Sequence, residues 1–329
     1  MIPVAIRGME FAVPKQAFTN DDMAKIVDTS DEWITQRTGI KTRYIASAEE
    51  NSVTLATEAV KKLFESTKVD PDSIDLIISA TSAPERPYPS VACEMQYAFN
   101  LQNAGALDIV AACSGFIYAL QLARAVIGAG IYKRVLVVAA DTTNKFVNWE
   151  DRSSCVLFGD GASATIVEVS PDGQDDITTI NLYADGRYKE IISLNVSSTL
   201  CPLHEKPKEE PSKVIFMNGK DVYKYVMKRI PAIIEDTLQS ANMSMDDIDF
   251  FIPHQANLRM IEALAERLNL SSDKVLTNIE KYGNMSATSI PCVISEFMKK
   301  GVIKNDSTLL LSAFGAGMTA ACAIVKVRK

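Results

Sequence analysis

The chain has 329 residues, of which 47% are hydrophobic and 23% are charged, and its formal net charge is −7. This composition excludes a disordered chain and predicts a globular protein with a large core and about two domains. The negative charge argues against general nucleic-acid binding, and the sequence has no run of 18 apolar residues that would span a membrane.

The cysteines and histidines limit the chemistry that the chain can carry out. The six cysteines form no CxxC pair, which predicts reduced intracellular thiols: Cys93, Cys113, Cys155, Cys201, Cys292 and Cys322. The N-terminus lacks the layout of a signal peptide, so we expect a cytoplasmic protein. Cys201 and His204 lie in a Pro-rich, charged segment that predicts a surface loop, and since no second ligand pair has suitable spacing, we expect no metal site.

The first half of the chain predicts alternating helices and strands. Apolar residues at helical spacing predict a helix over 53–64, and an Asp-rich turn at 70–75 leads into a buried strand over 76–80. The elements that follow are a short helix, a strand, a second helix and two more strands, over 91–99, 107–111, 116–127, 135–140 and 162–169.

Cys113 stands on the predicted turn between the strand 107–111 and the helix 116–127. A nucleophile on such a turn is pushed out of the sheet toward substrate. The N-terminus of the following helix also favours the thiolate. An arbitrary cysteine is more often a buried structural residue. The turn, with its small neighbours, favours a nucleophile here.

The second half repeats the order of the first. Its predicted elements are a helix, an Asp-rich turn, a strand, a helix, a short segment and two strands, over 222–241, 244–249, 250–252, 258–268, 275–279, 308–312 and 320–327. The Ile-Asp pairs at 74–75 and 248–249 align. We therefore predict a duplicated α/β fold with mainly parallel sheets, divided into halves over 1–170 and 171–329.

This duplication places three polar residues at strand ends, where ligands bind in α/β sheets. Cys113 and Asn284 fall on equivalent turns, and His254 follows the first strand of the second unit. A lone His or Asn in a turn is by default a structural residue. A cysteine protease also uses Cys, His and Asn, but there His is the base. A thiol facing two neutral donors suits an acyl thioester and a stabilised enolate, as in a Claisen condensation.

The chain resembles, essentially end to end, the β-ketoacyl-acyl-carrier-protein synthase III family of the thiolase-like superfamily. The resemblance rests on six motifs in the family's order, at 31–40, 112–115, 158–162, 253–259, 282–286 and 313–317. It implies a homodimer with a five-layer αβαβα fold. It also implies that Cys113, His254 and Asn284 are catalytic. Cys113 would be acylated by a short acyl-CoA, and malonyl-acyl carrier protein would lose carbon dioxide and attack, giving the 3-oxoacyl-carrier product that initiates fatty acid synthesis.

The same resemblance implies that coenzyme A is part of a substrate and that no cofactor is tightly bound. Trp33, Arg37 and Arg152 would hold its adenine and phosphate end, and Asn257 its pantetheine arm. The chemistry is sensible, because Arg stacks on flat rings and binds phosphate with several donors. The alternatives are a partly buried anchor for Trp33 and ordinary surface charges for the two arginines.

Acyl carrier protein is acidic, so docking on this acidic chain needs a local basic face. Arg259, with Lys224, Lys228 and Arg229, would supply it, although a solvated helix face is an equal alternative. The resemblance further implies an acyl pocket at Phe314 and at Tyr88, the latter reaching the pocket of the other subunit. Backbone N–H groups of Cys113 and the turn 313–317 would form an oxyanion hole, in which Ala316 stands where the family usually has glycine.

The sequence alone leaves open the choice of primer and two alternative functions. The primer can be acetyl or a branched group such as isobutyryl or methylbutyryl. The chain can be a related condensing or acyl-transferring enzyme of secondary metabolism, since fold and catalytic residues do not fix a substrate. The last is a non-catalytic partner protein on the same fold, which the presence of all three polar residues disfavours.

Overall fold

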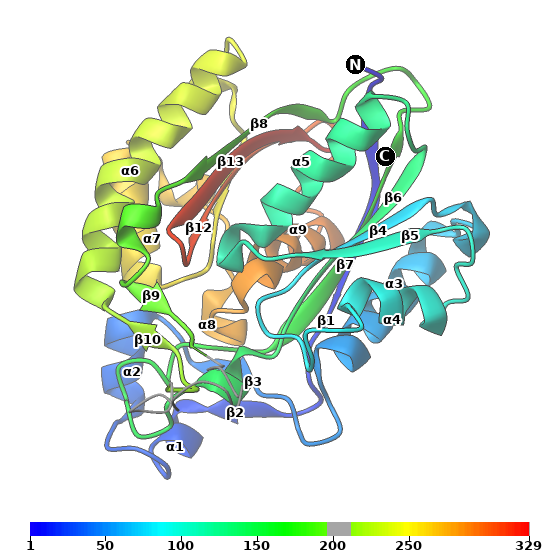
Figure 1. Cartoon of the computed structure of the whole chain (residues 1–329). Coiled ribbons are helices and arrows are strands. Elements are labelled where there is room, and N and C mark those ends of the chain that lie inside the picture. The colour runs from blue at the N-terminus through cyan, green and yellow to red at the C-terminus, as the bar shows by residue number, and fades with distance from the viewer. Residues whose placement is uncertain (196–211, 329) are drawn as a thin grey trace, which may run out of the picture.

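The computed structural model describes residues 1–195 and 212–328. Two main β-sheets organise the chain (Figure 1). Cys201 and His204, for which we expected a surface loop without a metal, lie outside the described residues. Among those that are described, no helix is both long and apolar enough to cross a membrane.

The first sheet has the strand order β1-β7-β6-β4-β5. Its strand β4 is parallel to β5 and β6, whereas β7 is antiparallel to β1 and β6. Every residue of β4 is buried, as its continuous apolar sequence predicts for a strand covered on both faces. The bounds are β1 (Val4–Ala12), β4 (Leu76–Ala80), β5 (Gly105–Ile109), β6 (Arg134–Asp141) and β7 (Gly161–Val169).

The second sheet has the order β11-β12-β13-β8, with β11 parallel to β12 and the other pairs antiparallel. A parallel bridge between Phe251 and Val275 extends its β11 edge. In order and direction, β8, β13, β12 and β11 thus repeat β1, β7, β6 and β4, which confirms the predicted duplication. The bounds are β8 (Ile177–Ala184), β11 (Phe250–Pro253), β12 (Thr308–Gly315) and β13 (Thr319–Lys326).

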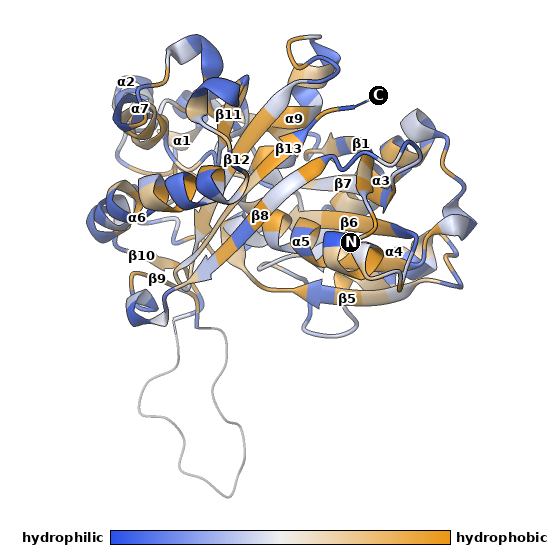
Figure 2. Cartoon of the chain, turned by 90° about the horizontal axis from the view of Figure 1, so that it is seen from above, coloured by the Kyte–Doolittle hydropathy of each residue, from blue (hydrophilic) through white to orange (hydrophobic). Residues whose placement is uncertain are grey.

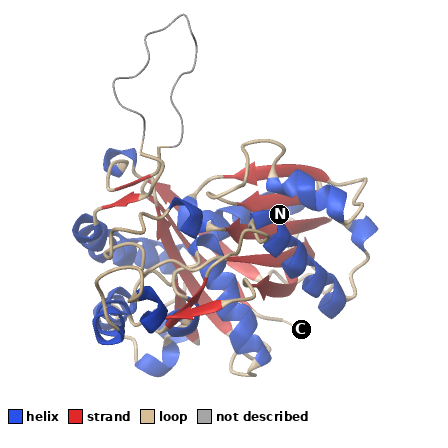
Figure 3. Ribbon diagram, turned by 90° about the horizontal axis from the view of Figure 1, so that it is seen from below, coloured by secondary structure: helices blue, strands red, loops and turns tan. Residues whose placement is uncertain are grey.

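Helices and sheets stack in five layers (Figures 1 and 3). Helices α5 (Gly115–Gly128) and α9 (Ser289–Lys299) lie between the sheets, and their apolar residues form one core with both. The outer helices are α3 (Ser52–Thr67) and α4 (Val91–Ala98) on the first sheet and α6 (Gly219–Ser240) and α7 (Leu258–Arg267) on the second. Figure 2 shows hydrophobic residues along the strands and many hydrophilic ones on α6. This is the pattern expected for buried sheets under amphipathic helices.

The remaining short elements gather beyond one end of the two sheets (Figure 1). Among them, α2 begins where Ser30 Oγ accepts the Trp33 N–H at 3.1 Å and ends at Gly39, whose φ is 77°. A Cβ at Gly39 would lie 2.4 Å from Leu258, so α2 packs closely on α7. These elements are β2 (Ala17–Thr19), α1 (Asn20–Met23), α2 (Asp31–Thr38), β3 (Thr42–Tyr44), β9 (Ile192–Ser193), β10 (Phe216–Met217) and α8 (Ile279–Tyr282).

Candidate active site

A cleft of about 1570 Å³ opens at the ends of the strands. Both halves contribute to its lining. Most of the site residues predicted from the sequence line it: Trp33, Arg37, Cys113, His254, Asn257, Arg259, Asn284 and Phe314. Arg152 and Tyr88 are not in the lining.

Cys113 lies on a 3-10 turn, Ala112–Ser114, directly before α5. Two features build this turn. Ala112 has a φ of 45°, which is unusual for a residue with a side chain. Ser114 Oγ donates to Ala111 O at 2.7 Å and contacts Thr319 Oγ1 at 2.8 Å, so strand β13 of the second half helps to hold the turn. Cys113 as a whole residue is half-buried and lines the cleft.

Burial raises the pKa of the Cys113 thiol to about 12. The Ser286 hydroxyl opposes this rise in pKa, and the charge of Asp141 adds to it. The resting thiol is therefore protonated at neutral pH, which differs from the thiolate that the helix N-terminus led us to expect. Desolvation disfavours a charged sulfur, so acylation has to include removal of the thiol proton.

His254 follows β11 and is only 2% exposed. Its backbone N–H donates to Ser312 O at 2.7 Å, and its ring packs edge-on against Phe314 with the centroids 5.5 Å apart. Burial lowers the pKa of His254 to about 3, so the imidazole is neutral. Nδ1 has no hydrogen-bond partner in the described part of the chain. A neutral imidazole carries one N–H donor, which suits it to hydrogen-bond a developing oxyanion.

Asn284 follows α8 and Gly283, whose φ is 66°. Its backbone N–H donates to Leu157 O at 2.9 Å, and its carbonyl accepts the Gly159 N–H at 3.0 Å. These two bonds hold the second-half turn to the first half. The side-chain Oδ1 accepts the Ser286 N–H at 2.9 Å. This contact fixes the amide orientation and leaves Nδ2 as the donor that an enolate oxygen needs.

The end of β12 packs directly on the Cys113 turn. A Cβ at Gly315 would lie 2.6 Å from Cys113 N and 2.8 Å from Ala112 Cβ, so this approach requires glycine. The contact brings the turn 313–317 to the backbone amide expected in an oxyanion hole. Ala316 is not among the residues with positive φ, so alanine replaces the usual glycine there without backbone strain.

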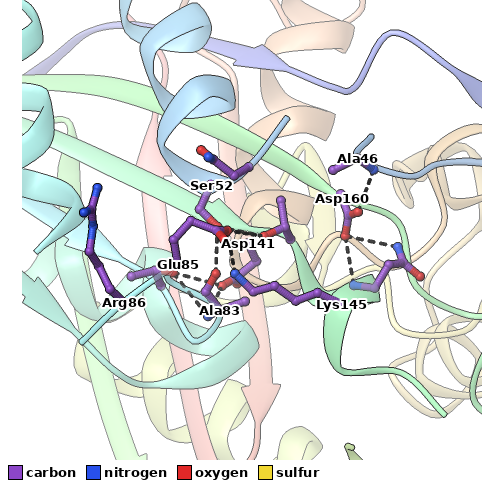
Figure 4. Close-up of polar contacts among 12 residues, drawn as sticks. Ala46, Ser52, Ala83, Glu85, Arg86, Asp141, Lys145 and Asp160 are labelled. Carbon is purple, nitrogen blue, oxygen red and sulfur yellow. Dashed lines mark hydrogen bonds and ion pairs between the residues drawn. The ribbon is translucent and has the colours of Figure 1, made fainter. Parts of the chain in front are cut away.

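A buried carboxyl beside this centre was not predicted from the sequence. Asp141 ends β6 and is fully buried, and its Oδ1 accepts the N–H groups of Ser82 and Ala83 at 2.7 and 3.1 Å (Figure 4). Burial raises its pKa. Its position at a strand end, where we placed the other polar residues, is a signal that could have identified it. The carboxyl fixes the loop that forms one wall of the cleft.

Asp160, in the motif at 158–162, is a second buried carboxyl (Figure 4). It accepts the N–H groups of Ala46 and Asn144 at 2.9 and 3.1 Å. Burial raises its pKa to about 6, although these hydrogen bonds oppose the rise. Asp160 therefore links the loops that contain Ala46 and Asn144 through hydrogen bonds. Asp160 is not among the residues that line the cleft.

The predicted coenzyme A residues meet at the edge of the cleft. The guanidinium carbons of Arg37 and Arg152 lie 5.6 and 5.1 Å from the centre of the Trp33 ring. Arg152 also donates to Asp28 O at 2.8 Å. Asn257 caps α7 by accepting the Arg259 N–H at 3.0 Å and donates to Arg37 O at 3.0 Å, so its amide joins α2 to α7.

The described ranges, 1–195 and 212–328, hold no group of three His, Cys, Asp or Glu side chains that could bind a metal ion.

Two family profiles match the chain. One, described as 3-oxoacyl-[acyl-carrier-protein (ACP)] synthase III, matches residues 107–186, and the other, described as the C-terminal part of the same enzyme, matches residues 238–327. These ranges contain Cys113 in one case and His254 with Asn284 in the other.

Relatives match over nearly their full lengths. A β-ketoacyl-[acyl-carrier-protein] synthase III of Caldanaerobacter subterraneus subsp. tengcongensis is 42% identical over 328 residues, covering 100% of this chain and 99% of the relative. The crystal structure of 3-oxoacyl-[acyl-carrier-protein] synthase III from Aquifex aeolicus is 40% identical, with a TM-score of 0.90 over 98% of this chain and 100% of that one. The priming β-ketosynthase of the R1128 polyketide pathway is 29% identical, with a TM-score of 0.91 over 99% and 97%.

Proposed function

The chain belongs to the 3-oxoacyl-acyl-carrier-protein synthase III family, and from this membership we propose a mechanism that runs through Cys113, His254 and Asn284. As a member of this family the chain is an acyltransferase of fatty acid biosynthesis. It condenses an acyl group from coenzyme A with malonyl-acyl carrier protein, and carbon dioxide is released. The observation that carries the residue assignment is the convergence of these three side chains on one cleft.

The first half-reaction is acyl transfer to Cys113. The sulfur attacks the thioester carbonyl of acyl-CoA, and the new oxyanion accepts hydrogen bonds from backbone N–H groups of Cys113 and the turn at Gly315. The carbonyl re-forms as the bond to the coenzyme A sulfur breaks. The proton that Cys113 loses is balanced by the one that the departing coenzyme A thiolate gains.

The second half-reaction uses the two neutral donors. Malonyl-carrier loses carbon dioxide by cleavage of a C–C bond, and the electron pair becomes an enolate whose oxygen accepts hydrogen bonds from His254 and Asn284 Nδ2. The carbanion then attacks the carbonyl carbon of the Cys113 thioester, the C–S bond breaks, and the released Cys113 thiolate takes up a proton from solvent to restore the neutral thiol. A neutral His254 is suited to this role because it donates a hydrogen bond without carrying a charge that would have to be desolvated.

Acyl-CoA enters as a substrate, and we propose no tightly bound cofactor. Trp33 offers a flat ring for adenine, and Arg37 and Arg152 supply donors for phosphate at the same edge of the cleft. Asn257 is the candidate for the pantetheine arm, since it lines the same cleft as His254 and bonds to the backbone of Arg37. Phe314 is proposed as a wall of the acyl pocket next to His254.

We propose a homodimer formed through the β5 edge of the first sheet. A sheet edge presents unpaired backbone groups that a second copy can use. Val110, directly after β5, is 80% exposed, and Tyr88 is 83% exposed and is not among the residues that line the cleft of its own chain. An exposed Tyr88 is consistent with a side chain that reaches the acyl pocket of a partner subunit.

A cytoplasmic location is also proposed. All the cysteines in the described part of the chain are free, as expected for a reducing compartment: Cys93, Cys113, Cys155, Cys292 and Cys322.

A second candidate is a priming condensing enzyme of a specialised pathway. The similarity to the R1128 priming β-ketosynthase favours it, at 29% identity and a TM-score of 0.91. The same three residues would act on another primer or another carrier, because the site does not fix the substrate.

The test of the proposed function is product formation from a panel of acyl-CoA primers and malonyl-acyl carrier protein. We expect mass spectrometry to detect a 3-oxoacyl-carrier product with at least one primer. Cys113→Ala should abolish it, and Cys93→Ala should retain it, since Cys93 is exposed on α4 outside the cleft. If the enzyme forms no product from the malonyl carrier with any primer but turns over another nucleophile, the proposal is contradicted and the second candidate is favoured.

A further inference from the structure

Gln255, the residue after His254, is completely buried and uses both ends of its side-chain amide. Nε2 donates to Pro253 O at 2.7 Å, and Oε1 accepts the Asn278 N–H at 3.1 Å. Since Pro253 and Gln255 flank His254, the hydrogen bond to Pro253 fixes the backbone that carries the imidazole. A buried amide with both ends paired holds its surroundings in one arrangement.

Asn278 extends this link to the turn that carries Asn284. It directly precedes α8, after which the chain continues through Gly283 into Asn284. The Asn278 Nδ2 donates to Glu296 Oε2 at 2.9 Å and lies 3.4 Å from Cys292 Sγ. Glu296 and Cys292 belong to α9, which begins shortly after Asn284. The segments before and after the Asn284 turn, Asn278 on one side and α9 on the other, therefore belong to one buried polar cluster.

The Glu296 side chain of that cluster is a charged carboxylate. It is 9% exposed and pairs with Lys300 at 3.0 Å and Lys281 at 3.4 Å. Burial works to raise the pKa of Glu296, but the hydrogen bonds from Asn278 and Lys300 and the charge of Lys281 outweigh it, so the pKa is lowered. A carboxylate anchored in this way resists movement of Asn278.

We propose that Gln255 is a positioning residue for condensation, which sets the His254 imidazole relative to the Asn284 amide. The inference rests on the proposed function of these two donors. It follows from the bonds that join Gln255 to the backbone on one side of His254 and, through Asn278, to the Asn284 turn. The His254 ring makes no hydrogen bond through Nδ1 within the described residues, so its place depends on its backbone and on Phe314.

The Cys113 turn is held by Ser114 and Thr319, and the Ser286 hydroxyl at its thiol is not one of the groups that Gln255 bonds. Loosening the Gln255 link should therefore affect condensation and spare acylation. Gln255→Met keeps the length of the side chain and removes both hydrogen bonds. We expect it to lower the single-turnover condensation rate by about 10-fold to 100-fold, since a misplacement of about 1 Å is enough for such a loss.

The matched control is Gln96→Met. Gln96 Nε2 also donates to a backbone carbonyl, that of Leu101, at 2.9 Å, but neither residue lines the cleft. This variant should leave both half-reactions unchanged. If Gln255→Met does not fold, Gln255→Glu tests half of the link, because it keeps the oxygen that accepts from Asn278 and loses the N–H that donates to Pro253. It too should slow condensation with acylation unchanged.

The experiment pre-acylates the full-length enzyme, adds malonyl-acyl carrier protein, and follows product and carbon dioxide release. In a His254→Ala background, Gln255→Met should cause no further loss of malonyl decarboxylation, because the two residues act as a unit. An additional loss of the same factor would overturn the proposal. So would an equal fall of acylation and condensation, which indicates a purely structural role. Failure of the unaltered enzyme to condense malonyl-carrier would instead contradict the proposed function.

Discussion

Burial shifts the pKa values of the two ionisable groups at the reaction centre in opposite directions. It raises the pKa of Cys113 to about 12 and lowers that of His254 to about 3. In both cases the uncharged form is favoured, because desolvation disfavours a charge of either sign. The resting site is thus a neutral thiol facing neutral donors. Hydrolytic enzymes with a Cys–His ion pair differ from this arrangement.

The two half-reactions should therefore respond differently to pH. Acylation should speed up from about pH 6 to about pH 9, because the thiolate fraction grows about tenfold per pH unit below the pKa of the thiol. Condensation by the pre-acylated enzyme should show no titration near pH 6.5, since His254 stays neutral well below that pH. Single-turnover rates of each step against pH check this. An acid limb near pH 6.5 in the condensation step would contradict the neutral imidazole.

The residues that the sequence identified stand at strand ends or are rare in composition. Cys113 and Asn284 occupy equivalent turns, and His254 is one of only two histidines. Asp141, Ser286 and Gln255 were missed, because their importance comes from partners distant in the chain. Gln255, for example, is linked to Asn278, and the Cys113 turn to Thr319. Hydrogen bonds of this kind have no period or motif in a single sequence.

At the scale of elements, the strongly periodic helices and apolar strands were predicted well. The helix predicted over 222–241 is α6, Gly219–Ser240, and it begins earlier because Asn218 caps it by accepting the Asp221 N–H. The segment 275–279 was expected as a counterpart of β5, but the structure has only a bridge at Val275. The first and last helical turns and the short elements over the cleft depend on caps and packing, which periodicity does not reveal.

The turns that carry Cys113 and Asn284 share a backbone conformation that the sequence did not show. Ala112 has a φ of 45° and Ser286 a φ of 49°, one beside Cys113 and the other next to the residue after Asn284. Residues with side chains rarely adopt this conformation, and it persists where the surrounding structure enforces it. The contact of Gly315 with Cys113 N shows how tightly β12 encloses the first of these turns.

The whole molecule also has to bind an acidic partner although its own net charge is −7. Arg259 is exposed in the first turn of α7 and lines the cleft, which makes it the candidate for carrier docking. Arg259→Glu should raise KM for malonyl-acyl carrier protein by about tenfold, as expected when a charge at a docking contact is reversed, and leave acylation of Cys113 unchanged. Steady-state kinetics with both substrates measures this. Equal losses in both half-reactions would contradict the assignment of Arg259 to the docking face.

Duplication accounts for the division of labour across the whole molecule. In the mechanism that we propose, the first half supplies the thiol that holds the acyl group, and the second supplies the two donors for the enolate. The two halves meet where Asn284 bonds to Leu157 and Gly159 and where Gly315 packs on Cys113. Each half thus completes a site that neither contains alone.

The most direct test of this division is the intact mass of His254→Ala and Asn284→Ala after incubation with acyl-CoA and then with malonyl-acyl carrier protein. Both variants should gain one acyl group on Cys113 and then retain it, without forming a 3-oxoacyl product. If either variant fails to acylate Cys113, the assignment of separate roles to the two halves is wrong.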